Sequence, residues 1–492
     1  MLFNSPQYLF LFLPLTLLVY WFLTTRSWAY ASKWCIIFAS LLFYAWSAPH
    51  YLLVLVGSIL VNYLLGAAIR GAAGEHNGGR NVRKAVLIAG VAGNVLLLGY
   101  FKYANFLIET ANYIIGTRFS IVETGMPLGI SFFTFTQIAY LVDIYRQPNT
   151  ETTPLDYCLF IAFFPRILSG PITRYGEMMP ECAPDGGRRM NYTPLAAGLF
   201  LFSLGLFKKI VLATPCAEWA DNGFASAHAL GFVEAWVTSL SYSLQLYFDF
   251  SGYTDMALGA ALMFNIKLPI NFNAPYRATS IQDFWARWHM TLSRFLRDYV
   301  YIPLGGSRLG EFRTFWNILV TFLICGLWHG AGGLFVFWGL LHGLALIVYR
   351  LWRKTNFRMN AFVGWVITFS FVNSAWVFFR AKSWENAMDV LKGMVGLHGL
   401  KLPASWGSSL AFMSNRATFT DGWLNATRGS DESVLVVVGI LLIAIFGQTS
   451  DRIAHTLRPK TTTALLTGFM LFISFICMFS MNKQTPFIYF RF

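Results

Sequence analysis

The chain has 492 residues, of which 56% are hydrophobic and only 12% are charged. Soluble domains carry about 25% charged residues, so this composition excludes a soluble enzyme and predicts an all-α polytopic membrane protein. The net charge of +14 does not indicate a nucleic-acid partner, because the basic residues lie at the ends of apolar segments, where positive-inside topology places them.

The apolar segments predict one integral domain over residues 1–492, with about 11 spanning helices of about 20 residues each. Within 1–115, the segments 7–25, 29–48 and 51–70 are each long enough to cross a bilayer. The basic groups at 26–33 and 70–84 then lie on the same side, which predicts cytoplasmic loops there and an extracytoplasmic N-terminus. The first segment lacks a basic leading region and a small-residue cleavage site, so we expect a retained helix.

The sequence pattern changes in the second part of the chain, 120–355, which we expect to form the core. Between 126 and 300 the apolar runs are broken by prolines and glycines, among them Pro127, Gly129, Pro165 and Pro275. Broken helices survive at membrane depth only when they are buried in protein or line a cavity. This stretch therefore predicts re-entrant segments around a central cavity.

Residues 281–299 place their apolar and charged side chains on opposite faces of a helix, which predicts one amphipathic interfacial helix. Ser280 lies three residues before Asp283, as in a capping box. His289 falls at the edge of the apolar face, beside Trp285, so it is predicted to face inward.

The C-terminal part, 356–492, follows spans expected near 314–329 and 334–352. It contains one more span at 360–379, a polar stretch near 381–431 with short interfacial helices, and two last spans at 433–447 and 463–480. The six cysteines are scattered without a CxxC pair, so they predict neither a disulfide framework nor a zinc site.

His329 is the most informative single residue, because it ends an apolar run in the sequence CGLWHG. A polar group at that depth costs about 2.5–3.5 kcal/mol on insertion scales unless it faces a polar cavity. The flanking Gly326 and Gly330 leave room for a bulky group beside the ring. A reactive residue and a structural hydrogen bond between helices both remain open. His342 is expected to be structural, because Gly330–Gly333 should end one helix and begin another.

The segment 243–256 embeds polar residues in an apolar run. Gln245 and Asp249 are spaced i,i+4, as are Ser251 and Asp255, so each pair can share a helical face. Such residues either line a cavity or clamp helices together, and their charge partners are expected from Arg277, Arg287 or Lys208–Lys209. No histidine spacing predicts a metal site, and no G-x-S-x-G elbow predicts a serine hydrolase.

Several motifs in order resemble the membrane-bound O-acyltransferase family over nearly the whole chain. They are PLGISFFTF (127–135), LYFDFSGYTDM (246–256), FWARWH (284–289), LRDYVYIPLGG (296–306), GLWHG (326–330) and the FIYF ending (487–490). Within the family, the chain resembles the branch of the membrane subunit of bacterial alginate O-acetylation, with the D-alanyl transferase of teichoic acids as a cousin. One departure is Arg166, where that branch has histidine.

The resemblance implies a fold with a central tunnel and an enzyme of the bacterial inner membrane. It would take acetyl from cytoplasmic acetyl-CoA, its donor substrate, for an extracytoplasmic polysaccharide such as alginate, working with a periplasmic acetyltransferase partner among membrane lipid. His329 is then the catalytic histidine and His289 the second one; no permanently bound cofactor or metal is expected. Substrate-binding or tunnel-lining roles are expected for Trp328, Trp285, Trp288, Arg287, Gln245, Asp249 and Ser251.

Histidine suits this reaction because its pKa of about 6.5 makes it a base near neutral pH. His329 is expected to deprotonate the acceptor hydroxyl, and His289 to orient the acceptor or stabilise the oxyanion. Arg287, Arg294 and Arg297 either attract the phosphates of coenzyme A or form surface ion pairs. Alternative functions are D-alanyl transfer from a carrier protein, acetylation of peptidoglycan or cellulose, and, outside enzymes, polysaccharide transport.

Overall fold

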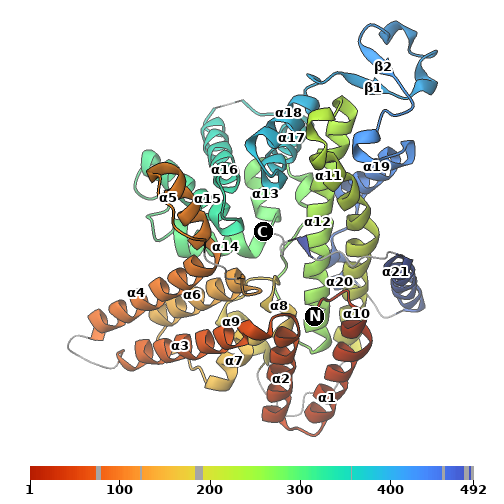
Figure 1. The fold of residues 1–492 in the computed structure, drawn as a ribbon. Coiled ribbons are helices and arrows are strands. Elements are labelled where there is room, and N and C mark those ends of the chain that lie inside the picture. The colour runs from red at the N-terminus through yellow and green to blue at the C-terminus, as the bar shows by residue number, and fades with distance from the viewer. Residues whose placement is uncertain are drawn as a thin grey trace.

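The computed structural model describes residues 1–73, 79–121, 125–182, 192–355, 357–456, 460–480 and 487–488 (Figure 1). The chain is an all-α polytopic membrane protein. In the described residues, eight helices are long and apolar enough to cross a membrane, fewer than the 11 or so expected. Two of the expected spans are not among them: that near 314–329, which is α15 (Glu311–His329), and that at 433–447, which is α19 (Asp431–Phe446) and has only 16 residues.

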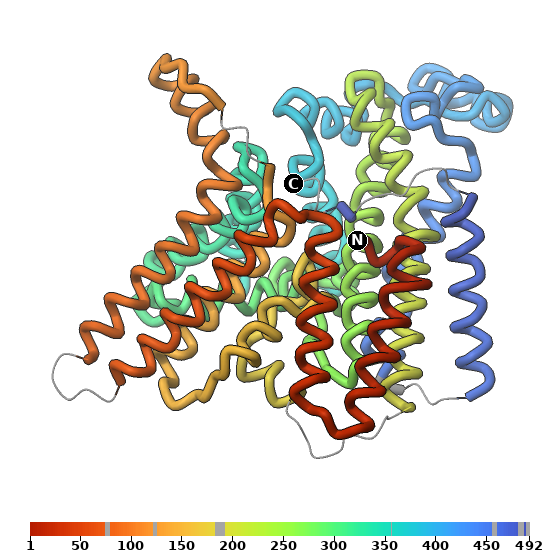
Figure 2. Tube along the Cα trace, turned by 60° about the horizontal axis from the view of Figure 1, so that its bottom comes forward, coloured from red at the N-terminus to blue at the C-terminus, as the bar shows by residue number. Residues whose placement is uncertain are grey.

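The N-terminal helices are α1 (Leu13–Thr25), α2 (Ala29–Ser47), α3 (Leu52–Gly71), α4 (Gly79–Leu98) and α5 (Ala104–Ile115). A π-helical turn, Gly99–Tyr103, joins α4 to α5, so that Gly79–Ile115 forms one long candidate span. In Figure 2, α1 and α2 run side by side, while α3 and α4 slope away from them as a second pair.

The centre of the fold is the long helix α12 (Phe232–Met263), against which α10 (Tyr192–Phe207) and α11 (Thr214–Ala225) pack. Glycines allow α10 and α12 to approach closely. A Cβ at Gly198 would lie 2.7 Å from the carbonyl oxygen of Gly259, and one at Gly205 would lie 2.5 Å from that of Gly252. Small residues at such contacts are the usual means of close helix packing in membranes.

Broken elements follow α5 as far as residue 182, as predicted, but the prediction is wrong for Tyr192–Ala225, a candidate span, and for α12, which runs unbroken through Gly252. The broken elements are α6 (Ile130–Arg146), α7 (Pro154–Ala162), α8 (Phe164–Ile167) and α9 (Tyr175–Met178). Gly129, the residue before α6, has a φ of +71°. A Cβ there would also lie 2.5 Å from the carbonyl oxygen of Ile167, so this glycine is needed for the close approach of the two breaks.

The prediction of one amphipathic helix over 281–299 is wrong. The segment forms α13 (Ile281–Arg287), a break, α14 (Met290–Leu296) and a π-helical turn (Arg297–Tyr301). His289 lies in the break with a φ of +41°. The predicted cap is confirmed, because the Ser280 side chain accepts a hydrogen bond from the Asp283 N–H at 3.1 Å. The apolar face is buried as predicted, including Trp285 and Leu292.

The helices α15 (Glu311–His329), α16 (Gly333–Trp352) and α17 (Ala361–Arg380) come next, and the expected break at Gly330–Gly333 is confirmed. The polar stretch holds α18 (Trp384–Met394) and an unpredicted parallel pair of strands, β1 (Leu400–Leu402) and β2 (Ala417–Phe419). Figure 1 shows these strands at the periphery of the molecule. The last helices are α19, α20 (Ser450–Thr456) and α21 (Thr461–Ser480).

One end of the molecule carries a connected group of basic residues, which we name the basic end. Arg83 at the start of α4 donates to the carbonyl of Tyr145, and Arg146 donates to the carbonyl of Asp298 at 3.2 Å. Asp298 in turn binds Arg297 at 2.8 Å. The basic end also includes Arg350, Arg353 and Lys354 at the end of α16, which share a cavity with Arg297.

Candidate active site

His329 is the last residue of α15 and borders a cavity of about 260 Å³. The imidazole is almost fully buried, with 3% of the residue exposed. The cavity lies where α15 ends and the break before α6 begins. Its lining residues are Lys102, Met126, Leu128, Gly129, Ile130, Ser131, Phe132, Leu168, Ser169, Trp328 and His329.

A close contact between α15 and α16 fixes the position of His329. A Cβ at Gly326 would collide with the carbonyl of Phe335, and one at Gly339 would collide with that of Phe322. The space beside Gly326 and Gly330 is therefore filled by α16, and the expectation that these glycines leave room for a bulky ligand is wrong. Their effect is to bring Trp338 against His329, with ring centroids 5.2 Å apart.

The carbonyl groups that end α15 are bound by two residues of the π-helical turn in the long N-terminal helix. Lys102 Nζ donates to the carbonyl of Trp328 at 2.6 Å and to that of His329 at 3.2 Å, and Tyr103 Oη donates to the carbonyl of Leu327 at 2.6 Å. A cation at a helix C-terminus is stabilised by the helix dipole. Lys102 was not among the predicted site residues, although a lone lysine within an apolar run is itself a functional signal.

His289 is fully buried, and its tautomer follows from its neighbours. Asn271 Oδ1 accepts hydrogen bonds from the Thr291 N–H at 3.2 Å and from the Thr291 hydroxyl at 3.0 Å. Because this oxygen is an acceptor, the His289 Nδ1 that lies 3.0 Å from it must carry the proton. In the neutral ring Nε2 then holds a lone pair, and in the described part of the chain it has no hydrogen-bond partner.

The indole of Trp328 connects the two histidines. Its centroid lies 4.9 Å from that of His329 and 5.8 Å from that of His289. Trp328 and His329 both line the 260 Å³ cavity, whereas His289 does not. Two of the predicted site residues thus meet at one cavity, and His289 lies against the same indole.

His342 lies on α16, away from that cavity. Its Nδ1 accepts a hydrogen bond from Trp285 Nε1 at 3.2 Å, and its ring lies 4.7 Å from Trp338. Trp338 contacts His329, while Trp285 contacts Trp338 at 5.9 Å. A continuous row of rings therefore leads from Trp285 to His329.

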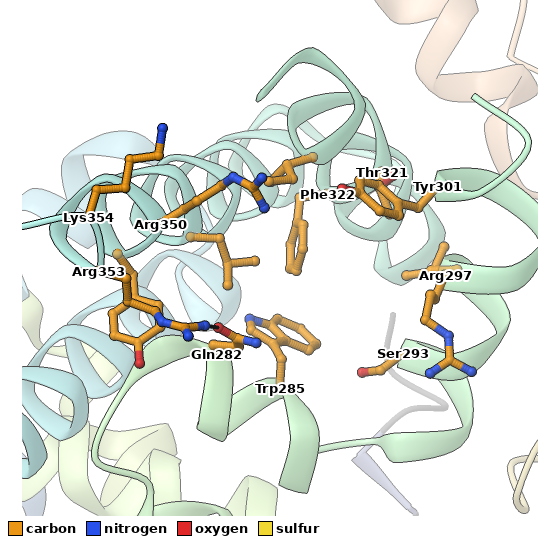
Figure 3. A pocket seen from close by; sticks show the side chains of 14 residues that line it. Gln282, Trp285, Ser293, Arg297, Tyr301, Thr321, Phe322, Arg350, Arg353 and Lys354 are labelled. Carbon is orange, nitrogen blue, oxygen red and sulfur yellow. Dashed lines mark hydrogen bonds between the residues drawn. The ribbon is translucent and has the colours of Figure 1, made fainter. Parts of the chain in front are cut away.

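Trp285 is also part of the wall of a second cavity, of about 610 Å³, at the basic end (Figure 3). Four of its lining residues are cationic, Arg297, Arg350, Arg353 and Lys354, and none is acidic. The remaining lining residues are Gln282, Trp285, Ser293, Leu296, Tyr301, Ile318, Thr321, Phe322, Leu346 and Tyr349. We name this cavity the cationic pocket; it can hold an anionic ligand whose apolar part extends toward Trp285.

The arginines predicted for anion binding are arranged differently from the expectation. Arg287 pairs with Asp283 at 2.7 Å on its own helix, and Arg294 forms two hydrogen bonds of 2.8 Å with Glu177. Of these three predicted arginines, only Arg297 lines the cationic pocket. Burial opposes ionisation of Asp298, but the hydrogen bond and charge of Arg297 outweigh it and hold the pKa of Asp298 below its ordinary value.

The polar residues of α12 lie in a second buried group. Lys209 pairs with Asp249, whose second oxygen accepts a hydrogen bond from the Ile488 N–H at 2.7 Å. Lys208 pairs with Asp255 at 2.7 Å, so the predicted lysine partners are found for both carboxylates. Asp249 thereby anchors the chain terminus; Tyr489 and Phe490 of the FIYF ending lie outside the described residues.

Three more predicted site residues are buried away from the His329 cavity. Gln245 and Ser251 lie on α12, and Trp288 stacks on Phe284 at 5.7 Å. Within the described residues, no group of three histidine, cysteine, aspartate or glutamate side chains is arranged to hold a metal ion. The chemistry that this arrangement supports is that of a buried imidazole base with an adjacent ammonium group.

Comparison with known proteins agrees with this geometry. Residues 10–384 match the MBOAT, membrane-bound O-acyltransferase family. The chain is 44% identical to a peptidoglycan O-acetyltransferase of Helicobacter pylori, covering 100% of this chain and 98% of that one. It is 37% identical to a probable alginate O-acetylase of Pseudomonas aeruginosa, over 94% of this chain and 84% of that one. A teichoic acid D-alanyltransferase of Bacillus subtilis is 29% identical over 53% of this chain and 70% of its own length. The chain therefore belongs to the membrane-bound O-acyltransferase family and is an acyltransferase.

Proposed function

We propose that the protein transfers acetyl from cytoplasmic acetyl-CoA to the hydroxyl of an extracytoplasmic polysaccharide. The observation that carries the proposal is a cavity that His329 borders at the end of α15, with the cationic pocket farther along the same helix. The cationic pocket borders Ile318, Thr321 and Phe322 in the middle of α15, and the other cavity borders Trp328 and His329 at its end. The proposal therefore places the acceptor in the cavity beside His329 and the donor in the cationic pocket, from which its thioester would extend to His329.

The composition of the cationic pocket supports coenzyme A as the donor. Arginine guanidinium groups bind phosphate through paired, charge-assisted hydrogen bonds, and three arginines and a lysine line this pocket. Its volume of about 610 Å³ lies within the usual range for cofactor sites. The row of rings from Trp285 to His329 marks the direction in which the thioester would extend.

In the proposed reaction, neutral His329 accepts the proton of the acceptor hydroxyl as that oxygen attacks the thioester carbonyl carbon. The tetrahedral intermediate then collapses, the C–S bond breaks, and the imidazolium returns the proton to the leaving thiolate. The products are an O-acetyl ester and free coenzyme A. The ammonium group of Lys102, on the same cavity wall, is suited to stabilise the oxyanion. No permanently bound cofactor is needed.

The proposed role of His289 changes from that of an oxyanion donor to that of an acceptor. With its proton held on Nδ1 by Asn271, the neutral ring offers only the Nε2 lone pair. Because it lies outside the His329 cavity, His289 would act on the acceptor substrate through Trp328, whose ring it contacts, rather than bind an oxyanion. Trp328, which contacts both histidines, would form the wall between donor and acceptor.

The polysaccharide is proposed from the relatives. The 44% identity to a peptidoglycan O-acetyltransferase makes peptidoglycan the first acceptor to test, and the alginate O-acetylases make alginate the second. D-alanyl transfer from a carrier protein is the alternative donor chemistry. We place the protein in the bacterial inner membrane with the basic end in the cytoplasm and the N-terminus outside, where a partner acetyltransferase would receive the acetyl group.

The test is turnover of labelled acetyl-CoA by the purified full-length protein. His329→Ala should lower the rate by at least 10²-fold, as expected for loss of a general base. His228→Ala, at an exposed histidine, is the matched control and should retain the rate. Full activity in a normally folded His329→Ala protein would overturn the proposal.

The donor is tested separately by comparing acetyl-CoA with a D-alanylated carrier protein. Arg350→Gln removes one charge from the cationic pocket and should raise the KM for acetyl-CoA roughly tenfold, because a hydrogen bond to a charged group contributes about 1.5–3 kcal/mol. Turnover of the carrier protein with none of acetyl-CoA would replace the acetyl donor by the alternative.

A further inference from the structure

A larger groove lies beside the cationic pocket, between α16 and α17. Its volume is about 1120 Å³. Along most of its length the walls are apolar, from Leu341, Leu344, Ala345 and Val348 of α16 and from Gly364, Ile367, Thr368 and Phe371 of α17. At a rise of 1.5 Å per residue, the α16 wall from Leu341 to Trp352 is about 16 Å long, which approaches the length of one leaflet's acyl chains.

The end of this groove at the basic end is polar and cationic. Arg353 and Arg358 are its two charged lining residues, joined by Thr279, Ser280 and Asn360, and no acidic residue lines it. Among the described residues, the Arg353 side chain donates to the neutral Gln282 Oε1, at 3.4 Å. Within the described residues, neither arginine forms an ion pair. An apolar groove that ends in two unneutralised guanidinium groups matches an amphiphile with an anionic head.

We propose that this groove binds an anionic glycerophospholipid from the leaflet at the basic end. Its phosphate would be held by Arg353 and Arg358, and an acyl chain would lie between α16 and α17. The lining favours a lipid over a soluble anion, because the apolar walls account for most of the groove. It favours an anionic head over a zwitterionic one, because no carboxylate is present to bind a choline or ethanolamine group.

The groove and the cationic pocket share a wall. Tyr349 and Arg353 line both cavities, and Arg353 contacts Gln282, which lines the cationic pocket. A lipid phosphate on Arg353 would reduce the charge available to a donor phosphate. The lipid is therefore expected to raise the KM for the donor and leave kcat unchanged. This coupling, unlike the lipid site itself, depends on the proposed function.

Lipid binding is tested by native mass spectrometry of the full-length protein with dioleoyl phosphatidylglycerol and dioleoyl phosphatidylcholine. Arg358→Gln, which affects only the groove, should lower the occupancy of phosphatidylglycerol at least fivefold, and Arg358→Lys should retain most of it. Arg350→Gln, at a residue that lines only the cationic pocket, is the matched control and should not change it. Equal binding of the two lipids, or equal occupancy in Arg358→Gln, would overturn the site.

The coupling is tested by measuring the KM for acetyl-CoA in nanodiscs of each lipid. Phosphatidylglycerol should raise the KM two- to fivefold more in the wild type than in Arg358→Gln. The general repulsion of coenzyme A by an anionic membrane is the same for both proteins, so it cancels in this comparison. An identical lipid effect in both proteins would overturn the coupling. If no acetyl transfer occurs, the proposed function fails, while the mass spectrometry still decides the lipid site.

Discussion

At the scale of single residues, the contact between His289 and Asn271 allows a test that separates position from chemistry. Asn271→Ala removes the acceptor that fixes the His289 tautomer while leaving the imidazole in place. At metal sites, loss of the partner that orients a histidine typically costs about 10–100-fold in activity, and we take the same range for this metal-free histidine. We expect kcat for acetyl transfer to fall by that factor, measured with the same labelled donor.

The matched variant is Thr291→Val, which removes the hydroxyl that donates to Asn271 and accepts from the Ile172 N–H, and leaves the bond between Asn271 and His289. It should lower kcat less than threefold. If Asn271→Ala and Thr291→Val reduce kcat equally, Asn271 serves the local fold, and the orienting role assigned to it is wrong.

Arg166 is a second single residue with a testable effect, here on stability. It is buried without a counter-ion in the described part of the chain. It is 4% exposed, its Nη1 donates to Thr136 Oγ1 at 3.3 Å, and its guanidinium lies 4.5 Å from the Phe160 ring. Its Nε and Nη2 have no partner there. Replacing a buried ion pair by apolar side chains often stabilises a protein by about 1–4 kcal/mol, and Arg166 lacks even the attraction of a counter-ion that offsets desolvation in such a pair.

We therefore expect Arg166→Met to raise the thermal unfolding midpoint in detergent. Arg174→Met provides the contrast, because it breaks the ion pair with Asp298 and should lower the midpoint or leave it unchanged. A fall in the midpoint of Arg166→Met would mean that the hydrogen bond to Thr136 and the contact with Phe160 outweigh the cost of burial.

At the scale of secondary-structure elements, the site depends on how closely α15 and α16 approach. Gly326→Ala places a methyl group against the Phe335 carbonyl and must separate the two helices. Overpacking of this kind costs about 1–3 kcal/mol. Because Trp338 and His329 meet across this contact, we expect both a lower unfolding midpoint and at least a tenfold loss of acetyl transfer.

Gly333→Ala is the control for that change, since a Cβ at the first residue of α16 meets no atom within 4 Å. Its midpoint and rate should match those of the wild type. Wild-type activity in Gly326→Ala would show that the helix contact does not determine the position of His329.

The segment 281–299 shows which features of a helix sequence periodicity predicts and which it does not. Its apolar face and its cap at Ser280 are predictable, because both depend on residues within a few positions of one another. The break at His289 is not predictable, because hydrogen bonds between residues 14 and 19 positions apart accompany it. The Met290 N–H donates to the carbonyl of Asn271, and the Asn273 N–H donates to that of Arg287, both at 3.0 Å.

At the scale of the whole molecule, the site shows the same limit of sequence analysis: local features can be predicted, and contacts between distant segments cannot. His329 could be identified from the sequence because its cost at membrane depth is a local property. Lys102, 227 residues earlier, reaches the end of α15 only through the packing of the long N-terminal helix. The cationic pocket is likewise formed by residues from 282 to 354, which include neither Arg287 nor Arg294 of the prediction.

The orientation of the whole molecule in the membrane determines which cavity faces which substrate, and it can be measured with two serines. Ser307 lies beside the basic end, before α15, and Ser409 lies in the polar stretch beyond α18; both are exposed. In intact cells, a membrane-impermeant maleimide should label Ser409→Cys, and it should label Ser307→Cys only after permeabilisation. The wild type, with six free cysteines, gives the background. Labelling of Ser307→Cys in intact cells would put the cationic pocket outside, where acetyl-CoA is absent, and the proposed direction of transfer would fail even if His329 were essential.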